Sequence, residues 1–444
     1  MGGCCWSCSL CCFRKCSFWL SPEEKSVIEI NRNINRMLKE QKKQESHGIK
    51  ILLLGTGESG KTTFIKQMRI IHGDGYSSEQ CQAFKRLIYQ NIYTAMKSMV
   101  QAMDTLKLSY ILPGNEENAR RLLQVDVPQV QTFEPQDVDA IRRLWEDPGI
   151  KWCYRRRQEY HLLDSTKYYL THLDRIGQPN YIPSLDDVLR VRVHTTGIQE
   201  YSFTIKKTNL RIVDVGGQKS ERKKWIHCFE NVTSLIFLAS LSEYDQVLEE
   251  NNQENRMKES LALFYSVIHS AWFIRASIIL FLNKEDILQE KIHTSHLCSY
   301  FPNFKGEKQN ADAAKDFICN MYKDLQRLKP RRVEANQTAR HRQVKEEDEV
   351  DISNKEIYPH FTCATDTENI TRVFNSIKDD LLKQSLKAFG ILPSFVFSLP
   401  TLAPFIRDPE VLQVFVVPRG VVEELPIRAQ QQLQHPLVAS TEPN

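Results

Sequence analysis

The chain has 444 residues, more than one typical domain, so two domains with tails are expected. Its 41% hydrophobic and 26% charged residues are enough for a sizeable core, which excludes a wholly disordered chain. A net charge of +4 is too small to indicate nucleic-acid binding, and no nucleic-acid partner is predicted. No apolar run has the length of a transmembrane helix, because the nearest one, residues 391–406, contains Pro393, Pro400 and Pro404.

Cysteines gather at the amino terminus, where six of the 12 lie within the first 16 residues. The others are scattered singly, as is typical of free thiols in a reducing compartment. Clustered cysteines beside Arg14, Lys15 and aromatic residues favour S-palmitoylation, and two or more acyl chains anchor a protein firmly to a membrane. Trp6 stands where the myristoylation pattern requires Ser or Thr, so myristate is not predicted. The cysteines expected to be acylated are Cys4, Cys5, Cys8, Cys11 and Cys12.

An iron–sulfur site is the alternative for these cysteines. Cys5, Cys8 and Cys11 have a suitable spacing, but the fourth cysteine and the following proline of such a motif do not fit. We therefore favour acylation and attachment of a cytosolic protein to a membrane surface.

The first regular element expected is a helix that starts at Pro22, with Ser21 as its N-cap. Apolar side chains recur along it at helical spacing and form one stripe on a charged rod. No second helix follows to cover the stripe. Two interpretations remain, packing on the protein's own body or, as we favour, docking to a partner protein. The stripe consists of Val27, Ile30, Ile34, Met37 and Leu38.

Beyond this helix, apolar runs alternate with helical patterns. Residues 49–54 form an apolar run that is followed by glycine, which predicts a buried parallel strand. The pattern predicts an α/β domain, a mostly parallel sheet flanked by helices, that is interrupted by an all-helical insertion. Helical patterns lie within residues 76–190, most clearly at 86–103, 135–145 and 165–176; strands are expected at 209–215, 235–241 and 277–282, a charged loop at 331–351, and a last helix at 368–389 with a capping box of Thr365 and Glu368.

Residues 55–62 read Gly-Thr-Gly-Glu-Ser-Gly-Lys-Thr and follow the first strand directly. In this pattern the glycines let backbone N–H groups approach phosphate oxygens. Lys61 would reach the β- and γ-phosphates, and the Thr62 hydroxyl would coordinate Mg²⁺. A buried strand before the loop and a helix after it place the phosphates at a helix N-terminus. A glycine-rich turn without a ligand is the less favoured alternative.

Two segments predict guanine as the base. Residues 283–286, Asn-Lys-Glu-Asp, follow the strand 277–282 at the carboxyl edge of the sheet, where ligands bind. The Asp286 carboxylate can accept hydrogen bonds from the ring N–H and the exocyclic amine of guanine, a donor pair that adenine lacks. In residues 362–365, Thr-Cys-Ala-Thr, the Ala364 N–H is expected to face the guanine carbonyl. Taken alone, each segment is an ordinary turn after a strand.

Two further segments supply candidates for catalysis. Asp214 lies at the end of a strand and is expected near the metal, through a water. Gly217 can turn its N–H toward the γ-phosphate, and Gln218 would orient the attacking water. Residues 190–197 lie where the helical insertion ends. A threonine there would complete the Mg²⁺ coordination, and an arginine just before it would neutralise charge on the transferring phosphate.

Together these motifs resemble the α subunits of heterotrimeric G proteins, over about residues 21–392. The most telling segments are residues 55–72, GTGESGKTTFIKQMRIIH, and residues 214–232, DVGGQKSERKKWIHCFENV. Residues 207–213 and 249–264 further resemble the Gq class and, within it, the promiscuous haematopoietic type. The resemblance implies a Ras-like P-loop GTPase domain with an inserted helical domain. The implied division is 1–46 for the acylated terminus and its helix, 47–75 and 191–392 for the Ras-like domain, 76–190 for the helical domain, and 393–444 for an extension expected to be disordered.

The resemblance also implies roles for single residues around GTP or GDP. Arg192 would be the built-in catalytic arginine and Gln218 would position water. Thr62, Thr195 and, through a water, Asp214 would hold Mg²⁺. The residues expected to bind the nucleotide are Gly55, Glu58, Ser59, Gly60, Lys61, Thr62, Thr63, Asp164, Ser165, Leu189, Arg190, Thr195, Gly217, Asn283, Lys284, Asp286 and Ala364.

The implied function is a molecular switch on the cytoplasmic face of the plasma membrane. Such a switch couples seven-helix receptors to effectors such as phospholipase C-β. It binds a βγ dimer through its N-terminal helix and switch II, and it is regulated by RGS-type proteins. His194 stands where proline or lysine is usual, and Thr56 and Thr62 where alanine and serine are usual; each keeps the needed chemistry.

Three alternatives remain open. The chain continues beyond Leu392, where the resemblance ends, so a receptor-uncoupled variant is one of them. An adaptor that holds GTP without cleaving it is opposed by Arg192 and Gln218. A metabolic P-loop kinase or ATPase is opposed by the segment 283–286.

Overall fold

The computed structural model describes residue 26 and residues 29–37, 48–205, 208–248, 251–328 and 355–388, with the backbone alone at 251–253 and 379–388. The chain divides into two compact units, Met1–Ser385 and Leu386–Asn444. Several predicted features lie outside the described residues: the acylated cysteines, the Ser21 N-cap, the loop at 331–351 and the extension at 393–444.

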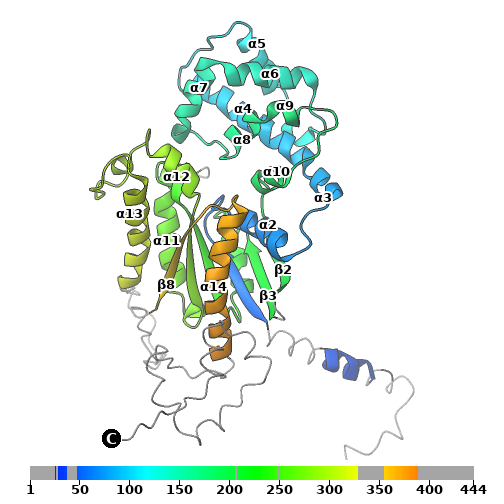
Figure 1. Cartoon of the computed structure of the whole chain (residues 1–444), viewed down its shortest axis with the longest axis vertical. Helices are drawn as coiled ribbons and strands as arrows, with labels where there is room; N and C mark the ends of the chain where they lie inside the picture. The colour runs from blue at the N-terminus through cyan, green and yellow to red at the C-terminus, as the bar shows by residue number, and fades with distance from the viewer. Residues whose placement is uncertain are drawn as a thin grey trace, which may run out of the picture. The chain divides into compact units, whose positions relative to one another are not determined.

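A six-stranded sheet forms the centre of the first unit, in the order β2-β3-β1-β4-β7-β8 (Figure 1). Strand β2 runs antiparallel to β3, and the other neighbouring pairs are parallel. The predicted mostly parallel sheet is therefore confirmed, although β2 was not foreseen. The strands are β1 (Ile49–Leu54), β2 (Ile198–Ile205), β3 (Thr208–Val215), β4 (Ser234–Ser240), β7 (Ser277–Asn283) and β8 (Ile357–Thr362), and a separate ribbon pairs β5 (Val247–Leu248) with β6 (Asn251–Asn255).

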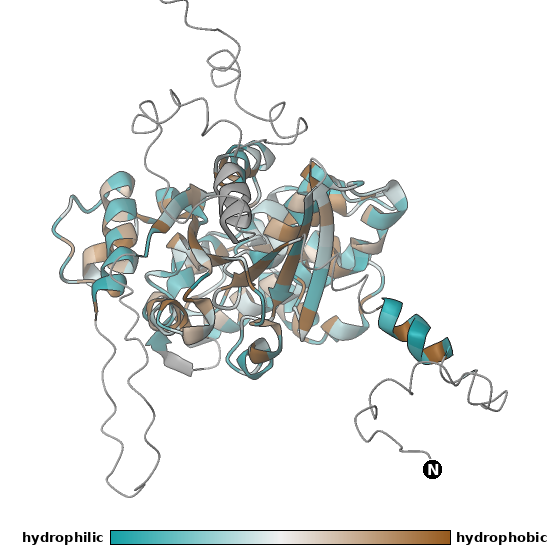
Figure 2. Ribbon diagram, turned by 90° about the horizontal axis from the view of Figure 1, so that it is seen from below, coloured by the Kyte–Doolittle hydropathy of each residue, from teal (hydrophilic) through white to brown (hydrophobic). Residues whose placement is uncertain are grey.

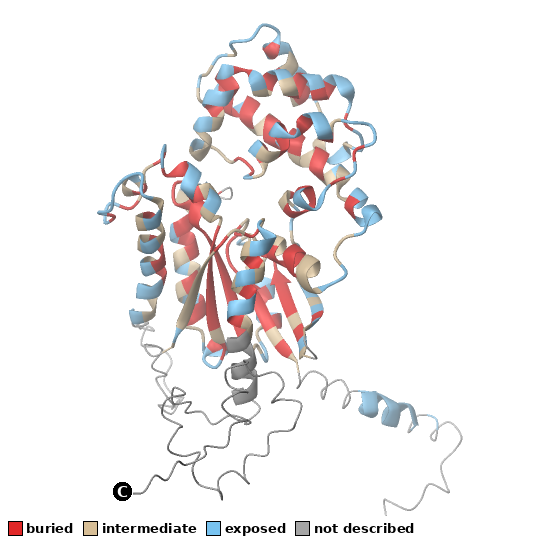
Figure 3. Cartoon of the chain, viewed as in Figure 1, coloured by how far each residue is buried: buried red, intermediate tan, exposed pale blue. Residues whose placement is uncertain are grey.

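Helices cover both faces of this sheet because its strands are apolar on both sides. Leu53 of β1 packs with Phe64 of α2 and Phe374 of α14 on one face. Its neighbour Leu52 packs with Phe264 of α11 on the other face, as the alternation of side chains along a strand requires. The central strands are accordingly coloured mostly hydrophobic in Figure 2 and mostly buried in Figure 3. The helices are α2 (Lys61–His72), α11 (Arg256–Ile268), α12 (Glu285–Lys291), α13 (Ala311–Asp324) and α14 (Thr367–Ala388), with short 3-10 helices at Arg222–Cys228, Leu241–Glu243, Ala271–Phe273, Leu297–Ser299 and Leu325–Arg327.

The segment between α2 and β2 is helical and has a hydrophobic core of its own. Its longest helix, α4, turns Ile88, Ile92, Met96, Met99 and Met103 toward that core, at the three- and four-residue spacing of one helical face. The all-helical insertion is thus present as predicted. Its helices are α3 (Ser78–Ala83), α4 (Lys85–Thr105), α5 (Asn115–Leu123), α6 (Pro135–Glu146), α7 (Pro148–Arg155), α8 (Thr166–Thr171), α9 (Leu173–Ile176) and α10 (Leu185–Arg190), with 3-10 turns at Val127–Gln129 and Arg157–Glu159.

Two local predictions were wrong. The helix expected at 165–176 is broken at His172, whose N–H is shared between the carbonyls of Tyr168 and Tyr169, so α8 and α9 are separate. The capping box of Thr365 and Glu368 is also absent from the described residues. Asp366 caps α14 instead, since its Oδ1 accepts from the Asn369 N–H at 2.9 Å.

No other described residue covers the apolar stripe of the N-terminal helix in its described part, residues 29–37. Ile30, Ile34 and Met37 are 55%, 47% and 66% exposed. None of the described helices is long and apolar enough to cross a membrane.

Candidate functional site

A pocket of about 500 Å³ lies between the carboxyl ends of the strands and the helical insertion. It is lined by the loops that follow β1, β3, β7 and β8 and by residues 162–165 and 189–193 of the insertion. All of the expected nucleotide and catalytic residues line this pocket except Gly55, Ser59 and Asp214. Those three lie directly behind the lining, as the contacts below show. Five segments, separated by up to about three hundred residues in the sequence, thus meet in one cavity.

The phosphate loop is held in shape by its own lysine. Lys61 Nζ donates to the carbonyls of Gly55 at 3.0 Å and Thr56 at 2.9 Å. Burial lowers the pKa of Lys61 to about 8. Only glycine fits at position 60, because its φ is 106° and an added Cβ would lie 2.2 Å from Asn283 Nδ2. The loop therefore presents backbone groups and one buried amine to the pocket.

Three oxygen-bearing side chains meet at the start of α2. Thr62 Oγ1 lies 2.8 Å from Thr195 Oγ1 and donates to Asp214 Oδ2 at 3.1 Å. The other carboxylate oxygen of Asp214, Oδ1, is buried and has no hydrogen-bond partner among the described residues. Burial raises the pKa of Asp214, although Lys61 opposes this. An all-oxygen set with an unpaired buried carboxylate oxygen fits a hard divalent cation such as Mg²⁺.

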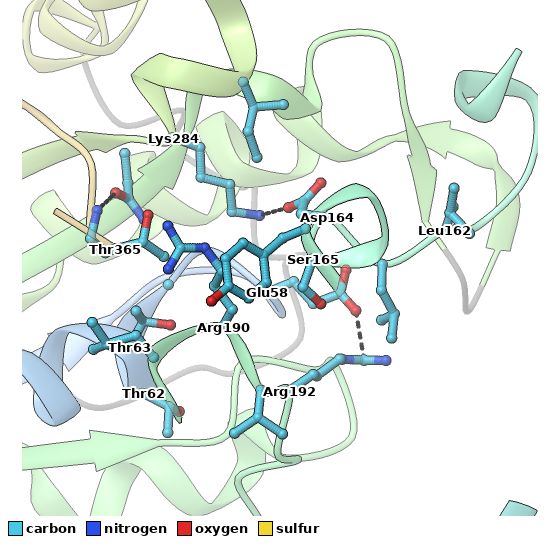
Figure 4. Close-up of a pocket in the computed structure, with 18 of the residues that line it drawn as sticks. Glu58, Thr62, Thr63, Leu162, Asp164, Ser165, Arg190, Arg192, Lys284 and Thr365 are labelled. Carbon is cyan, nitrogen blue, oxygen red and sulfur yellow. Dashed lines mark hydrogen bonds and ion pairs between the residues drawn. The ribbon is translucent and has the colours of Figure 1, made fainter. Parts of the chain in front are cut away.

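Arg192 is bound to the phosphate loop through Glu58, as the dashed line in Figure 4 marks. Its Nη2 lies 2.8 Å from Glu58 Oε1, and Arg256 Nη2 lies 3.3 Å from Glu58 Oε2. Burial would raise the pKa of Glu58, but a hydrogen bond from His161 and the charges of Arg256 and Arg192 outweigh it and hold that pKa well below its usual range. Glu58 is therefore ionised at neutral pH and keeps the Arg192 side chain at the pocket wall.

Gln218 also lines this pocket. Its Nε2 is 3.2 Å from His194 Nδ1, so the two switch segments, residues 190–197 and 214–218, are in contact through these side chains. Gly217 lies between them and Lys61, and an added Cβ there would be 2.6 Å from Lys61 Nζ and from the Thr56 carbonyl. The expected close approach of the Gly217 backbone to the phosphate position thus has a steric basis.

Asn283 connects the loops of the base side of the pocket. Its Nδ2 donates to the Ser59 carbonyl at 2.9 Å, and its Oδ1 accepts from the Ala364 N–H at 2.9 Å and from Thr362 Oγ1 at 3.2 Å. The Ala364 N–H, which we expected to face the guanine carbonyl, is engaged by Asn283 in this structure. Its contact with a base therefore stays a prediction. Asp286 is exposed to the pocket beside these loops.

Ion pairs join the helical insertion to the sheet domain across the pocket. Lys284 Nζ lies 2.5 Å from Asp164 Oδ2 (Figure 4). Burial works against both charges, yet their pairing leaves the pKa of Asp164 below and that of Lys284 above its ordinary value. Glu290 of α12 pairs with Arg157 at 3.2 Å and with Lys167 at 2.8 Å. These contacts close the insertion over the cavity.

The sequence did not indicate several residues that build this site. Arg256 of α11 is 5% exposed and donates to the Gly57 carbonyl at 2.8 Å, although 199 residues separate them. Asn91 and Lys66 hold the backbone around Arg192. Lys66 and Arg256 lie in segments that carry the family resemblance, but neither they nor Asn91 was given a role, because their partners are distant in the sequence.

The fold and the pocket define a P-loop nucleotide-binding protein with a Ras-like domain and an inserted helical domain. The family model described as the G-protein alpha subunit matches residues 28–381, and the chain belongs to this family. It is 53% identical over 380 residues to the human guanine nucleotide-binding protein subunit alpha-15, covering 86% of this chain and 98% of that protein. It is 52% identical over 377 residues to the mouse protein of that name and 53% identical to the rat one, with 85% of this chain and 98% of each relative covered.

Membership of the family confirms the recognition, the fold class and the enzyme class expected from the sequence. The chain is a guanine-nucleotide-binding GTPase and an α subunit that couples receptors to effectors. The family also implies βγ and receptor partners.

Proposed function

We propose that this α subunit hydrolyses GTP in the pocket described above with Arg192 and Gln218 as its catalytic residues. The observation that carries the proposal is the convergence of the phosphate loop, both switch segments and the guanine segment on one cavity. A second support is electrostatic, because Lys61 and Arg192 bring two cations to the side of the pocket where phosphates would lie.

Mg²⁺ would be held by Thr62, Thr195 and Asp214, whose oxygens already meet in the structure. A bound Mg²⁺ would neutralise phosphate charge and orient the β- and γ-phosphates. Thr195 belongs to the segment after the helical insertion, and Thr62 to the phosphate loop. A shared cation would therefore tie the first switch segment to the nucleotide.

For hydrolysis, the side chain of Arg192 would move from Glu58 toward the transferring phosphate, or share its guanidinium between the two. Gln218 would exchange its contact with His194 for the attacking water and hold that water in line. An arginine supplied within the chain contributes a factor of about 10³–10⁵ in this class of enzyme, for which G-protein α subunits are themselves a worked example.

On the base side, Asp286 would accept from the two donors of guanine, and Asn283, Lys284 and Ala364 would surround the ring. A receptor could reach this contact through α14. Thr362–Thr365 lead directly into that helix, and Asn369 of α14 accepts from the Cys363 N–H at 3.1 Å. A partner that pulls on α14 would thereby disturb the base site.

The proposal extends to partners and location, which the exposed surfaces and the family support. The uncovered stripe of Ile30, Ile34 and Met37 suits a βγ dimer. Phospholipase C-β as effector, RGS-type proteins as regulators, and acylation of Cys4, Cys5, Cys8, Cys11 and Cys12 at the cytoplasmic face of the plasma membrane complete the proposal.

Single-turnover hydrolysis of preloaded GTP by the purified full chain tests this function. Arg192→Ala and Gln218→Leu should each slow the reaction at least about 100-fold without preventing GTP binding. If either variant hydrolyses GTP as fast as the wild type, that residue is not catalytic. Absence of hydrolysis in the wild type would support the adaptor that only holds GTP. A chain ending at Leu392, compared with the full chain in receptor-stimulated GTPγS binding, tests the receptor-uncoupled alternative.

A further inference from the structure

The backbone of Arg192 lies in a segment without regular secondary structure. Residues 191–196 form neither helix nor strand, so no ladder supplies partners for their N–H and C=O groups. Arg192 nevertheless has a partner for each group. Asn91 Oδ1 accepts from the Arg192 N–H at 2.7 Å, and Asn91 Nδ2 donates to the Arg192 carbonyl at 3.3 Å.

Asn91 belongs to α4 of the helical insertion and is 101 residues from Arg192 in the chain. Its side-chain amide pairs with the peptide of Arg192 as a neighbouring strand would. Because that N–H and that C=O belong to the peptide units on either side of the Arg192 Cα, a two-point contact of this kind fixes the backbone on both sides of the residue.

A second residue holds the peptide just before Arg192 from the opposite domain. Lys66 of α2 donates through Nζ to the carbonyls of Val188 and Val191, both at 2.8 Å. The segment that leads into Arg192 is thus fixed by the sheet domain at Val191 and by the insertion at Arg192 itself. The Arg192 guanidinium lies at the end of a long side chain, so small shifts of its backbone move it relative to the pocket.

We propose that Asn91 is a positioning residue for Arg192, through which the helical insertion sets the geometry of GTP hydrolysis. This inference rests on the proposed catalytic role of Arg192. A misplacement of about 1 Å in a catalytic group can lower a rate about 100-fold, so losing this clamp should be visible in the chemical step.

A merely structural role of Asn91 predicts a different result. If Asn91 only closed the insertion over the nucleotide, its loss would speed GDP release and lower stability, but it would leave the hydrolysis of already bound GTP unchanged. The two roles are therefore separated by measuring single-turnover hydrolysis per bound GTP, which does not count unfolded or empty protein.

The test uses the full chain with three variants. Asn91→Ala should slow single-turnover hydrolysis about ten-fold. Asn91→Asp keeps the acceptor for the Arg192 N–H but turns a carboxylate oxygen toward the Arg192 carbonyl, so its rate should also fall below that of the wild type. The matched control is Gln90→Ala, the neighbouring amide on α4, whose Nε2 donates to the carbonyls of Pro128 at 3.2 Å and Val130 at 3.4 Å and does not contact Arg192. It should leave the rate unchanged.

A double-mutant cycle links the effect to Arg192. In an Arg192→Ala background, Asn91→Ala should add less than about two-fold, because the side chain that it positions is gone. If Arg192→Ala alone has no effect, the proposed function fails. If Arg192→Ala slows hydrolysis but Asn91→Ala does not, only the present inference is overturned. The same holds if the two losses multiply independently, or if Gln90→Ala slows hydrolysis as much as Asn91→Ala.

Discussion

At Gly60 the phosphate loop packs closely against Asn283 on the base side of the pocket. Gly60 precedes α2 with φ 106° and ψ 11°, in the left-handed region. An alanine Cβ there would lie 2.2 Å from Asn283 Nδ2, the atom that donates to the Ser59 carbonyl. Gly60→Ala therefore has to displace the side chain of Asn283, together with its contact to the Ala364 N–H.

The expected loss can be built from these contacts. A left-handed backbone costs an L-residue about 1–2 kcal/mol. Leaving the Ser59 carbonyl and the Ala364 N–H without their buried partner costs about 1–3 kcal/mol each. The variant would relieve the clash by moving the phosphate loop. Nucleotide binding would then have to return the loop to its wild-type position, at the expense of binding free energy. Since these costs total about 3–8 kcal/mol, the affinity for GDP should fall more than about 100-fold.

The assay is equilibrium binding of a fluorescent guanine nucleotide, combined with urea unfolding. Gly114→Ala is the matched control, since Gly114 also has a positive φ of 79° but no atom within 4 Å of the added Cβ. It lies before α5, in the helical insertion, and should lose about 1–2 kcal/mol of stability with unchanged nucleotide affinity. If Gly60→Ala bound GDP within five-fold of the wild type, while Gly114→Ala behaved as expected, the described packing of Gly60 on Asn283 would be refuted.

Three further predictions concern the base, the buried lysine and the metal. Asp286→Asn replaces an acceptor by a donor, so GDP affinity should fall at least about 100-fold while xanthosine diphosphate binds better than GDP; competition binding that still favours GDP contradicts the assignment. Burial lowers the pKa of Lys66 to about 7, so its charge destabilises the fold most below that pH and progressively less as the pH rises toward its unfolded value. The free energy of unfolding of the wild type relative to Lys66→Met should accordingly rise by on the order of 2 kcal/mol from pH 7 to 9, and a constant difference in urea unfolding would speak against a buried amine. Asp214→Asn should raise the Mg²⁺ concentration required for half-maximal GTP hydrolysis at least about ten-fold, and an unchanged Mg²⁺ titration would remove Asp214 from the metal site.

Much of the fold was predictable because its signals are local. The run from Ile49 to Leu54, the glycines after it and the helix that follows are one continuous segment, and the structure forms β1, the phosphate loop and α2 from it. The apolar strands β4 and β7 were recognisable for the same reason, since strands covered on both faces are nearly all apolar, and β3 was recognisable from its apolar residues Leu210, Ile212, Val213 and Val215. Strand β2 was missed because it lies at the sheet edge, where exposed and buried positions mix.

Local patterns predicted helix ends less reliably where two neighbouring residues can each begin or end the helix. Thr365 and Asp366 can both cap a helix, and the sequence favoured Thr365. The turn in which the Asp366 N–H donates to the Cys363 carbonyl starts α14 one residue later, so Asp366 takes the cap. The break at His172 is likewise decided within a few residues. The turns before and after it are both helical, and the helix is interrupted only where the His172 N–H is shared between two carbonyls.

Residue order was sufficient to identify the phosphate loop, the guanine segment, the two switch segments and the family, because each of these signals lies in a stretch shorter than twenty residues. Folding in three dimensions was needed to bring Arg256 to Gly57, Asn283 to Ser59 and Asn91 to Arg192, contacts that span 199, 224 and 101 residues. Such pairings depend on how the sheet and the insertion pack. The sequence around a single polar residue does not indicate which distant backbone group its side chain will contact in the folded protein.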